Sequence, residues 1–490
     1  MSASSYPYSF ERTSSAGELM EAWSALEPGA SSGYRASIAG RIMSLRGHGR
    51  VAFADLRDGS GTVQLFAQQN ALGAEGMAAF KDLNAGDIVG ATGEVIRTRR
   101  GELSLKVDDV VLLAECKRPM PEKWRGMTDV ETRYRQRHLD LIASPESRGM
   151  VEARAQANAT VRRFLAERGF IEVETPLLQP NAGGAIARPL VTHLDALDTD
   201  LYLRIAPELY LKRLLIGGFE RVYELNRSFR NESISTRHLN EFTMLEAYEA
   251  YVDYEHTMAL VESLVCAVAE AVNGSLELDR CEEVLDLGTT FRRMTMFDAI
   301  EVATGRDLEA AWYAGDEAEL VSVARSFGVL PEESWGPGKV LAEIFEATAE
   351  RKLIEPTFVA GFPKEVSPLA KDHRFLPGFT EQADLIIGGV ELAPIYSELN
   401  DPEEQRRRFE QQAGARAAGD AEATLPDDDF LEALAYGMPP AGGFGLGMDR
   451  LLTLLTGAGS IRDVVLFPTL WAASRTGAEP PSEPGPRSAR

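Results

Sequence analysis

Between residues 34 and 116, hydrophobic and polar side chains alternate with a period of two. Leu103, Leu105 and Val107, for example, are separated by polar residues, which is typical of a half-buried strand. The same alternation predicts strands over residues 35–45, 51–57, 62–68, 87–98 and 103–113. Glycine-containing turn signals at 58–61 and 99–102 separate neighbouring strands. Five short strands in so compact a stretch predict a small closed barrel.

Beyond residue 144 the apolar positions change to helical spacing. They predict a helix over residues 145–168, which Gly169 would end. Two strand-like runs, 219–225 and 242–248, flank a polar loop and predict an antiparallel hairpin. Residues 384–400 are strand-like again, around a glycine turn. Further helices are expected over 254–272, 291–353, 403–418 and 451–455. The pattern therefore indicates an α+β chain.

These changes of pattern divide the chain into segments. Residues 1–33, rich in Ser, Ala and Gly, are expected to be a partly disordered extension with a short helix near 16–26. A barrel over 34–116 and a polar linker over 117–145 follow. The larger domain would span 146–472, with a helical insertion at about 291–353, and 473–490 would be a disordered tail. The linker carries a basic cluster that could contact a phosphate backbone or form salt bridges between domains: Arg133, Arg135, Arg137 and His138.

Composition narrows the choice of function. The 490 residues suit two or three domains. A net charge of −24 argues against non-specific coating of nucleic acid but leaves room for a local basic face. No apolar run reaches the length of about 18 residues that a membrane span needs, and the N-terminus has no secretory pattern. Three cysteines without metal-type spacing indicate reduced thiols, so a cytoplasmic protein is expected.

The polar loop of the predicted hairpin, residues 227–240, concentrates cations. Guanidinium forks match phosphate oxygens, so the loop suits an anionic, phosphate-bearing ligand. The plain alternative is a solvated loop with surface ion pairs. Glu232 and Phe242 favour a purine nucleotide, because an aromatic face and a carboxylate are what the base would contact. The basic residues of the loop are Arg227, Arg230, Arg237 and His238.

Two further groups fit the same ligand. Gly445 and Gly447 would let the backbone approach a nucleotide, and Arg450 follows at the start of a helix. The chain has no Gly-Lys-Ser/Thr phosphate loop, so this nucleotide site would be built differently. Asp384 and Glu391 supply oxygen ligands of the kind that Mg²⁺ prefers, although each alone is more often a surface acid.

Acidic residues also lie inside apolar stretches, at Glu208, Glu246 and Glu398. Buried carboxylates need partners. A cationic substrate would supply one, and the alternative partners within the chain are Arg204, Lys212 and Arg213.

In the predicted barrel, Phe53 and Gln64 fall on neighbouring strands. The oligonucleotide-binding (OB) barrel is the commonest small barrel of this kind. An aromatic ring for stacking beside an amide for base edges is how single-stranded RNA is read. The alternative is that Phe53 belongs to the barrel core.

The motifs occur in the order of a known family. FRNE (229–232), RH (237–238) and EF (241–242) with Glu246, followed by GLGMDR (445–450), resemble motifs two and three of class II aminoacyl-tRNA synthetases. EVETP (172–176) resembles motif one. Residues 183–189, 205–213 and 396–400 are similar to lysyl-tRNA synthetases in particular, and the resemblance spans residues 34–470.

The resemblance implies a six-stranded antiparallel catalytic sheet flanked by helices, an N-terminal anticodon-binding OB-fold, and a homodimer formed through motif one. It implies adenylate formation from lysine and ATP with Mg²⁺, then transfer to tRNA(Lys). ATP would be held by Arg230, Glu232, Arg237, His238, Phe242 and Arg450, of which Arg230 and Arg450 would be catalytic, and Mg²⁺ by Asp384 and Glu391. The amino acid would be held by Gly184, Glu208, Glu246, Tyr248, Tyr396 and Glu398. Arg41, Phe53, Gln64 and Glu102 would read the anticodon.

One segment departs from the family pattern. Lysine enzymes usually have Asn-Gly or Asn-Ala before the aromatic that Tyr396 matches, whereas this chain has Ala393-Pro394-Ile395. The amide is lost, and Pro394 also lacks a backbone donor. Two other hypotheses therefore stand beside a lysine–tRNA ligase. One is a paralogue that activates a related amino acid, and the other is a non-enzymatic RNA-binding protein with the same fold.

Overall fold

The computed structural model describes residues 6–120, 129–181, 183–185, 187–280, 283–417 and 426–470. The tail predicted over 473–490 and part of the linker predicted over 117–145 lie outside the described residues. The chain divides into two compact units, Met1–Met127 and Thr128–Arg490. Each unit has a hydrophobic core of its own.

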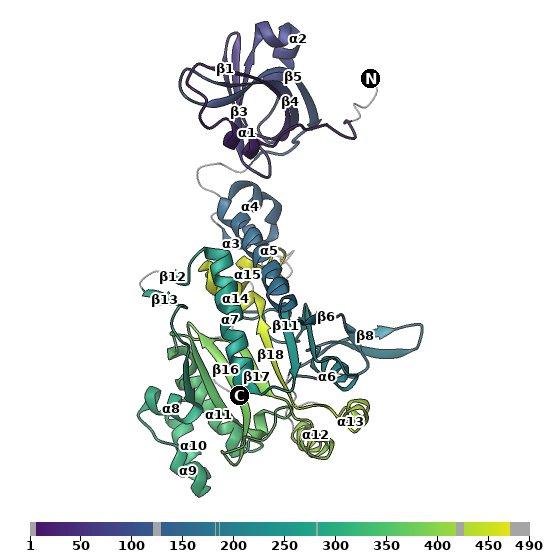
Figure 1. Ribbon diagram of the computed structural model, residues 1–490, viewed down its shortest axis with the longest axis vertical. Coiled ribbons are helices and arrows are strands. Elements are labelled where there is room, and N and C mark those ends of the chain that lie inside the picture. Colours follow the sequence, from purple (N-terminus) through teal and green to yellow (C-terminus); the bar gives the residue numbers. More distant parts are fainter. Residues whose placement is uncertain are drawn as a thin grey trace, which may run out of the picture. The chain divides into compact units, whose positions relative to one another are not determined.

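The first unit is a closed barrel with the strand order β1-β2-β3-β5-β4 (Figure 1). Its elements are α1 (Ala16–Ala22), β1 (Ser31–His48), β2 (Val51–Arg57), β3 (Thr62–Gln68), α2 (Gln69–Lys81), β4 (Ile88–Arg97) and β5 (Leu103–Ala114). Alternate residues of β2, namely Ala52, Ala54 and Leu56, are buried in the barrel core, as the period of two predicts. Leu19 of α1 joins the same core, so part of the expected loose extension packs against the barrel.

The second unit is built on an eight-stranded sheet with the order β14-β15-β16-β17-β18-β11-β10-β6. These strands are β6 (Ile171–Glu172), β10 (Arg221–Phe229), β11 (Glu241–Ala250), β14 (Arg292–Thr295), β15 (Thr357–Pro363), β16 (Phe379–Ile387), β17 (Val390–Ser397) and β18 (Ala441–Gly447). The six strands from β15 to β10 pair antiparallel, as expected. At the edges, β14 and β6 add parallel pairs that the sequence pattern did not predict.

The two faces of this sheet differ because side chains alternate along each strand. Leu245, Ala247 and Phe444 face a hydrophobic core that helices α5 (Pro145–Ala166), α7 (Tyr254–Asn273) and α14 (Met448–Thr456) complete (Figure 1). The opposite face carries Glu246 and Tyr248 on the neighbouring positions of β11. Side chains of β16, β17 and β18 alternate in the same way, so the sheet face opposite the hydrophobic core is polar.

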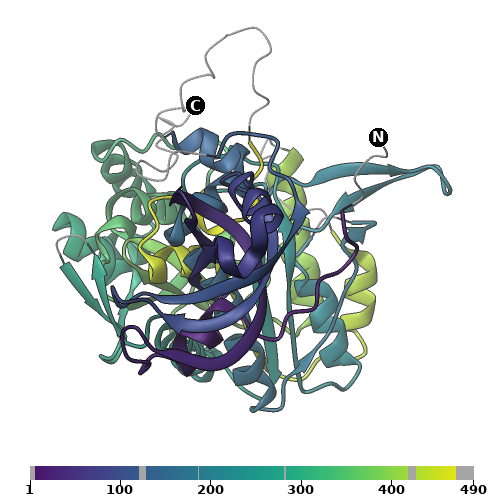
Figure 2. The ribbon, with the colours of Figure 1, turned by 90° about the horizontal axis from the view of Figure 1, so that it is seen from above.

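The remaining elements surround the sheet. The helices are α3 (Val130–Arg135), α4 (Arg137–Ala143), α6 (Glu208–Ile216), α8 (Met296–Thr304), α9 (Glu309–Ala314), α10 (Glu317–Ser326), α11 (Pro337–Thr348), α12 (Pro402–Ala417), α13 (Asp428–Leu434), α15 (Ile461–Val464), and the 3-10 turns η1 (Glu350–Lys352) and η2 (Lys364–Val366). Small sheets are formed by β7 (Leu178–Gln179), β8 (Leu190–Leu194) and β9 (Thr199–Leu203), and by β12 (Glu277–Arg280) and β13 (Glu283–Asp286). The β8–β9 hairpin projects from the second unit in both views (Figures 1 and 2).

The basic cluster of the predicted linker makes its contacts inside the second unit. Arg133 and Arg137 both pair with Asp140, at 3.0 and 2.7 Å. Arg137 is 3% exposed and donates to the carbonyl of Leu466 at 2.9 Å. These two arginines therefore hold helices together. Across the described part of the chain, no helix is both long enough and apolar enough to cross a bilayer.

Candidate active site

Arg230 and Phe242 form one corner of the polar face. Arg230 directly follows β10, and its guanidinium carbon lies 5.2 Å from the centre of the Phe242 ring on β11. The side chain of Asn240 donates to the carbonyls of Arg230 and Glu232, at 2.9 and 2.7 Å, which fixes the loop between the strands. Arg230 Nε is buried and has no hydrogen-bond partner among the described residues. A buried donor without a partner beside an aromatic face suits an anion attached to a planar base.

A second cationic group joins this loop to α14. Arg450 Nη2 lies 3.5 Å from His238 Nε2, and Nη1 donates to the backbone carbonyl of Glu391 at 2.8 Å. Burial and the charge of Arg450 lower the pKa of His238, so its imidazole is neutral at pH 7. Glu232 and Arg237 are exposed on the same loop, and the Glu232 charge partly offsets the lowering of the His238 pKa. The structure thus brings together residues more than 200 positions apart.

Carboxylates gather beside Arg450. Asp384 is buried on β16 and accepts a hydrogen bond from Gln382 Nε2 at 2.9 Å. Burial and the neighbouring Glu391 raise the pKa of Asp384 well above its ordinary value. Burial also raises the pKa of Glu346 on α11 to about 7, and that of Glu350. The sequence pattern does not single out these last two acids, because their spacing fits an ordinary helix end.

The acidic group fits Mg²⁺ in one specific way. Within the described ranges, no three His, Cys, Asp or Glu side chains are close enough to hold a metal by themselves. Mg²⁺ usually binds through one or two carboxylates together with substrate phosphates and water. Asp384 is buried without a cationic partner in the described structure, and Glu391 lies 3.6 Å from Arg450, so the two carboxylates fit an ion brought in with a nucleotide.

The three acids predicted to be buried do lie close to one another. Glu208 begins α6, Glu246 lies on β11, and Glu398 follows β17, with exposed fractions of 7%, 5% and 1%. Tyr248 donates its hydroxyl hydrogen to Glu246 Oε2 at 3.1 Å. Burial and the Glu208 charge raise the pKa of Glu246 to about 8. Burial raises the pKa of Glu398 to about 7, although Lys212 acts in the opposite direction.

Lys212 is the internal partner of two of these acids. Its ammonium nitrogen lies 2.7 Å from Glu208 Oε1 and 2.5 Å from Glu398 Oε2. The other two cations that the sequence offered as partners form ion pairs with other acids. Arg204 pairs with Glu224 at 2.7 Å, and Arg213 pairs with Asp427 at 3.3 Å. Glu398 Oε1 is buried without a hydrogen-bond partner in the described structure. Lys212 therefore pairs with two of the three carboxylates.

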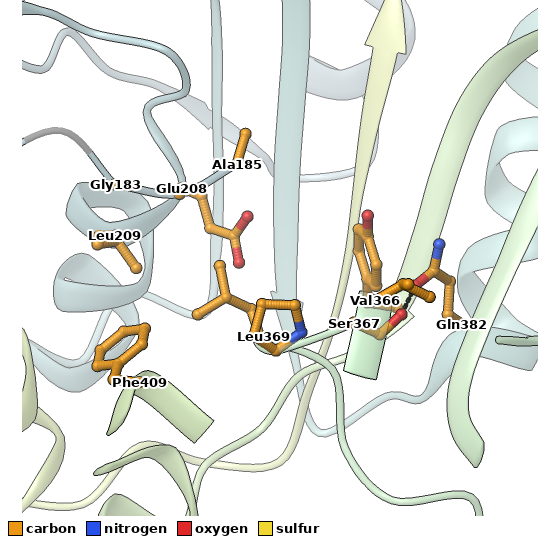
Figure 3. Close-up of a pocket in the computed structure, with 12 residues that line it drawn as sticks. Gly183, Ala185, Glu208, Leu209, Val366, Ser367, Leu369, Gln382 and Phe409 are labelled. Atoms are coloured by element: carbon orange, nitrogen blue, oxygen red, sulfur yellow. Dashed lines mark hydrogen bonds between the residues drawn. The ribbon is translucent and has the colours of Figure 1, made fainter. Parts of the chain in front are cut away.

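A cavity opens beside these acids (Figure 3). Glu208 points into it from α6, and the loop carrying Ser367 and Leu369 forms another wall. Tyr396 also lines the cavity. Gly184 lines it with a φ of +88°, a conformation that favours glycine, and a Cβ there would lie 3.3 Å from the Cβ of Glu208.

The unusual segment before Tyr396 divides between the two sheet faces. Ile395 is fully buried in the hydrophobic core and pairs in register with Phe444. Pro394 lies on the polar face and pairs in register with Asp384. The branched side chain of Ile395 therefore points away from the cavity, whereas Pro394 lies on the site face.

On the barrel, Phe53 and Phe66 stack with their ring centres 5.0 Å apart. Phe53 is half-buried on the face opposite the core residues of β2, so it is not a core side chain. Gln64 lies on the same face of β3 as Phe66 and accepts a hydrogen bond from Ser104 at 3.0 Å. Phe66 was not among the residues predicted for this face, although its spacing of two from Gln64 indicates that both side chains point the same way.

The other two barrel candidates, Arg41 and Glu102, differ in their contacts. Arg41 donates to the carbonyl of Gly86 at 2.7 Å, while Glu102 is exposed just before β5.

Comparison with known proteins gives consistent matches. A model described as tRNA synthetases class II (D, K and N) matches residues 129–470, and one described as OB-fold nucleic acid binding domain matches residues 36–113. The lysine–tRNA ligase of Syntrophomonas wolfei is 52% identical over 461 residues, covering 94% of this chain and 92% of that protein. That of Carboxydothermus hydrogenoformans is 50% identical, covering 95% and 94%, and that of Gloeobacter violaceus is 51% identical with the same coverage.

The matches span both units and include the polar sheet face with its cationic and acidic groups. The chain therefore belongs to the class II tRNA synthetases of the D, K and N group, and within it to the lysine–tRNA ligase family.

Proposed function

We propose that the protein activates L-lysine with ATP to form lysyl-adenylate and pyrophosphate. It then transfers the lysyl group to the 3′ end of tRNA(Lys) and releases AMP. The observation that carries this proposal is a buried pocket of three carboxylates, Glu208, Glu246 and Glu398, on the same sheet face as the unpartnered Arg230 Nε. Such a pocket selects a diamino acid, because an uncharged analogue would leave buried carboxylates unpaired.

In this proposal the nucleotide lies between the loop and α14. Phe242 stacks on adenine and Glu232 contacts its edge, while Arg230 holds the α-phosphate together with the amino-acid carboxylate. Arg237, His238 and Arg450 hold the outer phosphates. The 3.5 Å contact between Arg450 Nη2 and His238 Nε2 supports this assignment, because it holds an imidazole and a guanidinium, two groups able to donate to phosphate oxygens, side by side.

The substrate amino acid lies in the acidic pocket. Its α-ammonium group meets Glu208 near Gly184, and its ε-ammonium group meets Glu398 and Glu246, with Tyr248 hydrogen-bonded to Glu246. Tyr396 packs along the methylene stem, since it lines the same cavity.

The reaction needs positioning more than a strong base. The lysine carboxylate attacks the α-phosphorus in line and pyrophosphate leaves, which requires the two reacting groups to be held close together. Arg230 stabilises the charge that spreads over the phosphate oxygens. Mg²⁺ held by Asp384 and Glu391 would supply further positive charge to the phosphates.

We extend the proposal to the partners. The outer face of the barrel, with Phe53 and Gln64, reads the anticodon, assisted by Arg41 and Glu102. Two copies join through motif one, which is supported by apolar side chains that are half exposed there: Ile171, Leu177 and Leu178, at 48%, 40% and 47%. The enzyme would work in the cytoplasm.

The test is ATP–pyrophosphate exchange with a panel of amino acids that includes lysine, its isomers and ornithine, followed by charging of tRNA(Lys). We expect exchange with lysine above all others, and loss of about 100-fold or more in Arg230→Ala. Arg292→Ala is the matched control, because Arg292 is exposed on the edge strand β14. A response to another amino acid alone, or full activity in Arg230→Ala, would refute the proposal.

A further inference from the structure

Lys212 is completely buried at the centre of the acidic pocket. Its ammonium group donates hydrogen bonds to Glu208 Oε1 at 2.7 Å and to the carbonyl of Leu369 at 3.3 Å. It also forms an ion pair with Glu398 Oε2 at 2.5 Å. These acceptors come from α6, from the segment after β17, and from the loop that lines the cavity. One side chain therefore ties three walls of the pocket together.

A count of charges shows why the pocket needs this residue. This step rests on the proposed function. Lysine brings two ammonium groups, but the pocket contains three carboxylates, so one negative charge is left over. The substrate carboxylate is matched by Arg230, and the nearby Glu224 is already paired with Arg204. A further positive charge must come from the chain, because an unpaired buried charge is costly.

We propose that Lys212 is a positioning residue for amino-acid selection. It supplies this positive charge and bridges the carboxylate that meets the α-ammonium group to the one that meets the ε-ammonium group.

The way in which Lys212 shares its partners supports this role. It takes one oxygen of Glu208 and one oxygen of Glu398, so each carboxylate keeps an oxygen for the ligand. The remaining Glu398 Oε1 is buried without a hydrogen-bond partner among the described residues. It faces Gly443, where a Cβ would lie only 2.2 Å away, so the backbone at this position leaves space for it. Lys212 thus orients both acids and leaves the recognition of the substrate to them.

The first experiment replaces Lys212 with methionine, which keeps the length of the side chain and removes its charge. We expect the KM for lysine in pyrophosphate exchange to rise about 100-fold, since both acids lose a buried partner. The KM for ATP is expected to stay within about threefold, because Lys212 contacts none of the residues assigned to ATP. Arg213→Met is the matched control. It removes a charge from the next residue of α6, whose partner is Asp427, and should leave both constants nearly unchanged.

The pH profile supplies a readout that a purely structural role would not alter. The charged groups that contact Lys212 are Glu208 on α6 and Glu398 after β17, and Glu246 and Tyr248 on β11 lie next to these acids. Lys212 lowers the pKa of Glu398, so in Lys212→Met Glu398 holds its proton to higher pH and the pH at which the lysine KM reaches its minimum moves upward. An unchanged profile would argue against the bridging role.

A double-mutant cycle with Glu398→Gln tests the charge balance directly. With lysine bound, the pocket has one negative charge in excess in Lys212→Met and one positive charge in excess in Glu398→Gln. The double variant Lys212→Met/Glu398→Gln restores the balance of two acids and two ammonium groups. We expect the double variant to be no weaker in lysine KM than Lys212→Met alone. Effects that multiply would overturn the inference. Thermal unfolding checks that the variants fold. If neither Lys212→Met nor the double variant folds, the inference is also overturned.

The outcome separates this inference from the proposed function. Parent protein with normal lysine exchange, together with an unchanged lysine KM in Lys212→Met, overturns the inference alone. Parent protein without lysine-dependent exchange overturns the proposed function and this inference with it.

Discussion

Glu246 illustrates what burial does to a single carboxyl group. Its exposed fraction is 5%, its only described hydrogen-bond donor is Tyr248, and its pKa rises to about 8. In an empty pocket near pH 7 this acid therefore holds a proton. It can pair with an ammonium group only after that proton leaves, so lysine binding releases a proton in the proposed mechanism.

This release predicts how lysine recognition depends on pH. Because the pKa of Glu246 is raised, binding includes a deprotonation cost below pH 8 that disappears as the pH increases. The KM for lysine should fall about tenfold between pH 6.5 and pH 8, while the KM for ATP serves as the internal reference. Pyrophosphate exchange across this range measures both constants. A lysine KM that is constant or rises with pH would contradict the prediction.

Single residues also show which contacts could not be predicted from the sequence. The acids Glu208, Glu246 and Glu398 were found because charged residues stand out in apolar stretches. The actual partner of Glu208 could not be chosen among Arg204, Lys212 and Arg213, because the choice depends on which helix face turns inward. Glu346 and Glu350 were missed for the same reason, since their role comes from a distance to Asp384 that only the fold creates.

At the scale of elements, α12 is a charged helix that is mostly not buried, but it turns a few buried side chains toward the cavity loop. Arg408 is 3% exposed and donates to the carbonyls of Ser367, at 3.1 Å, and of Ala370. Gln405 Nε2 donates to the carbonyl of Pro368 at 3.1 Å. The loop that walls the cavity is therefore held by side chains of α12.

Loosening this loop should weaken lysine binding without affecting ATP. For Arg408→Met we expect the lysine KM to rise about tenfold, because buried carbonyls lose charged donors. The neighbouring Arg407→Met is the control, since Arg407 is 67% exposed and pairs only with Glu404 in the described structure. Steady-state exchange kinetics of both variants measure the difference. Equal effects of the two substitutions would argue against a specific role of Arg408.

Elements with a strong period were predicted well and weak ones were not. Strands β2 and β3 begin and end at the predicted residues, because β2 alternates throughout and the glycine turn at 58–61 separates the two strands. Helix α2 was missed, since its apolar residues are scattered and Gly73 breaks it with a φ of +74°. Strand β18 is rich in glycine, so its sequence does not indicate a strand. Its glycines fit because a Cβ at Gly443 would also lie 2.5 Å from the Tyr248 ring.

The whole molecule consists of two units with separate cores, so changes on the barrel should spare the chemistry of the catalytic unit. Phe53→Ala is expected to lower kcat/KM for tRNA(Lys) charging at least tenfold, since stacking on one base contributes about 1–3 kcal/mol. Pyrophosphate exchange without tRNA should not change. Phe53→Trp keeps a stacking ring and should retain charging. A loss of exchange in Phe53→Ala would show that the two units are not independent.

The alternation along β11 and its neighbours has a consequence for how this protein can vary over time. The same strands supply interior packing with every second residue and substrate contacts with the residues between. Deleting one position near Thr243 would turn Glu246 and Tyr248 toward α7 and send Leu245 and Ala247 into the pocket. We therefore expect the length of these strands to tolerate insertions and deletions poorly, and change there to be confined to one-for-one replacements.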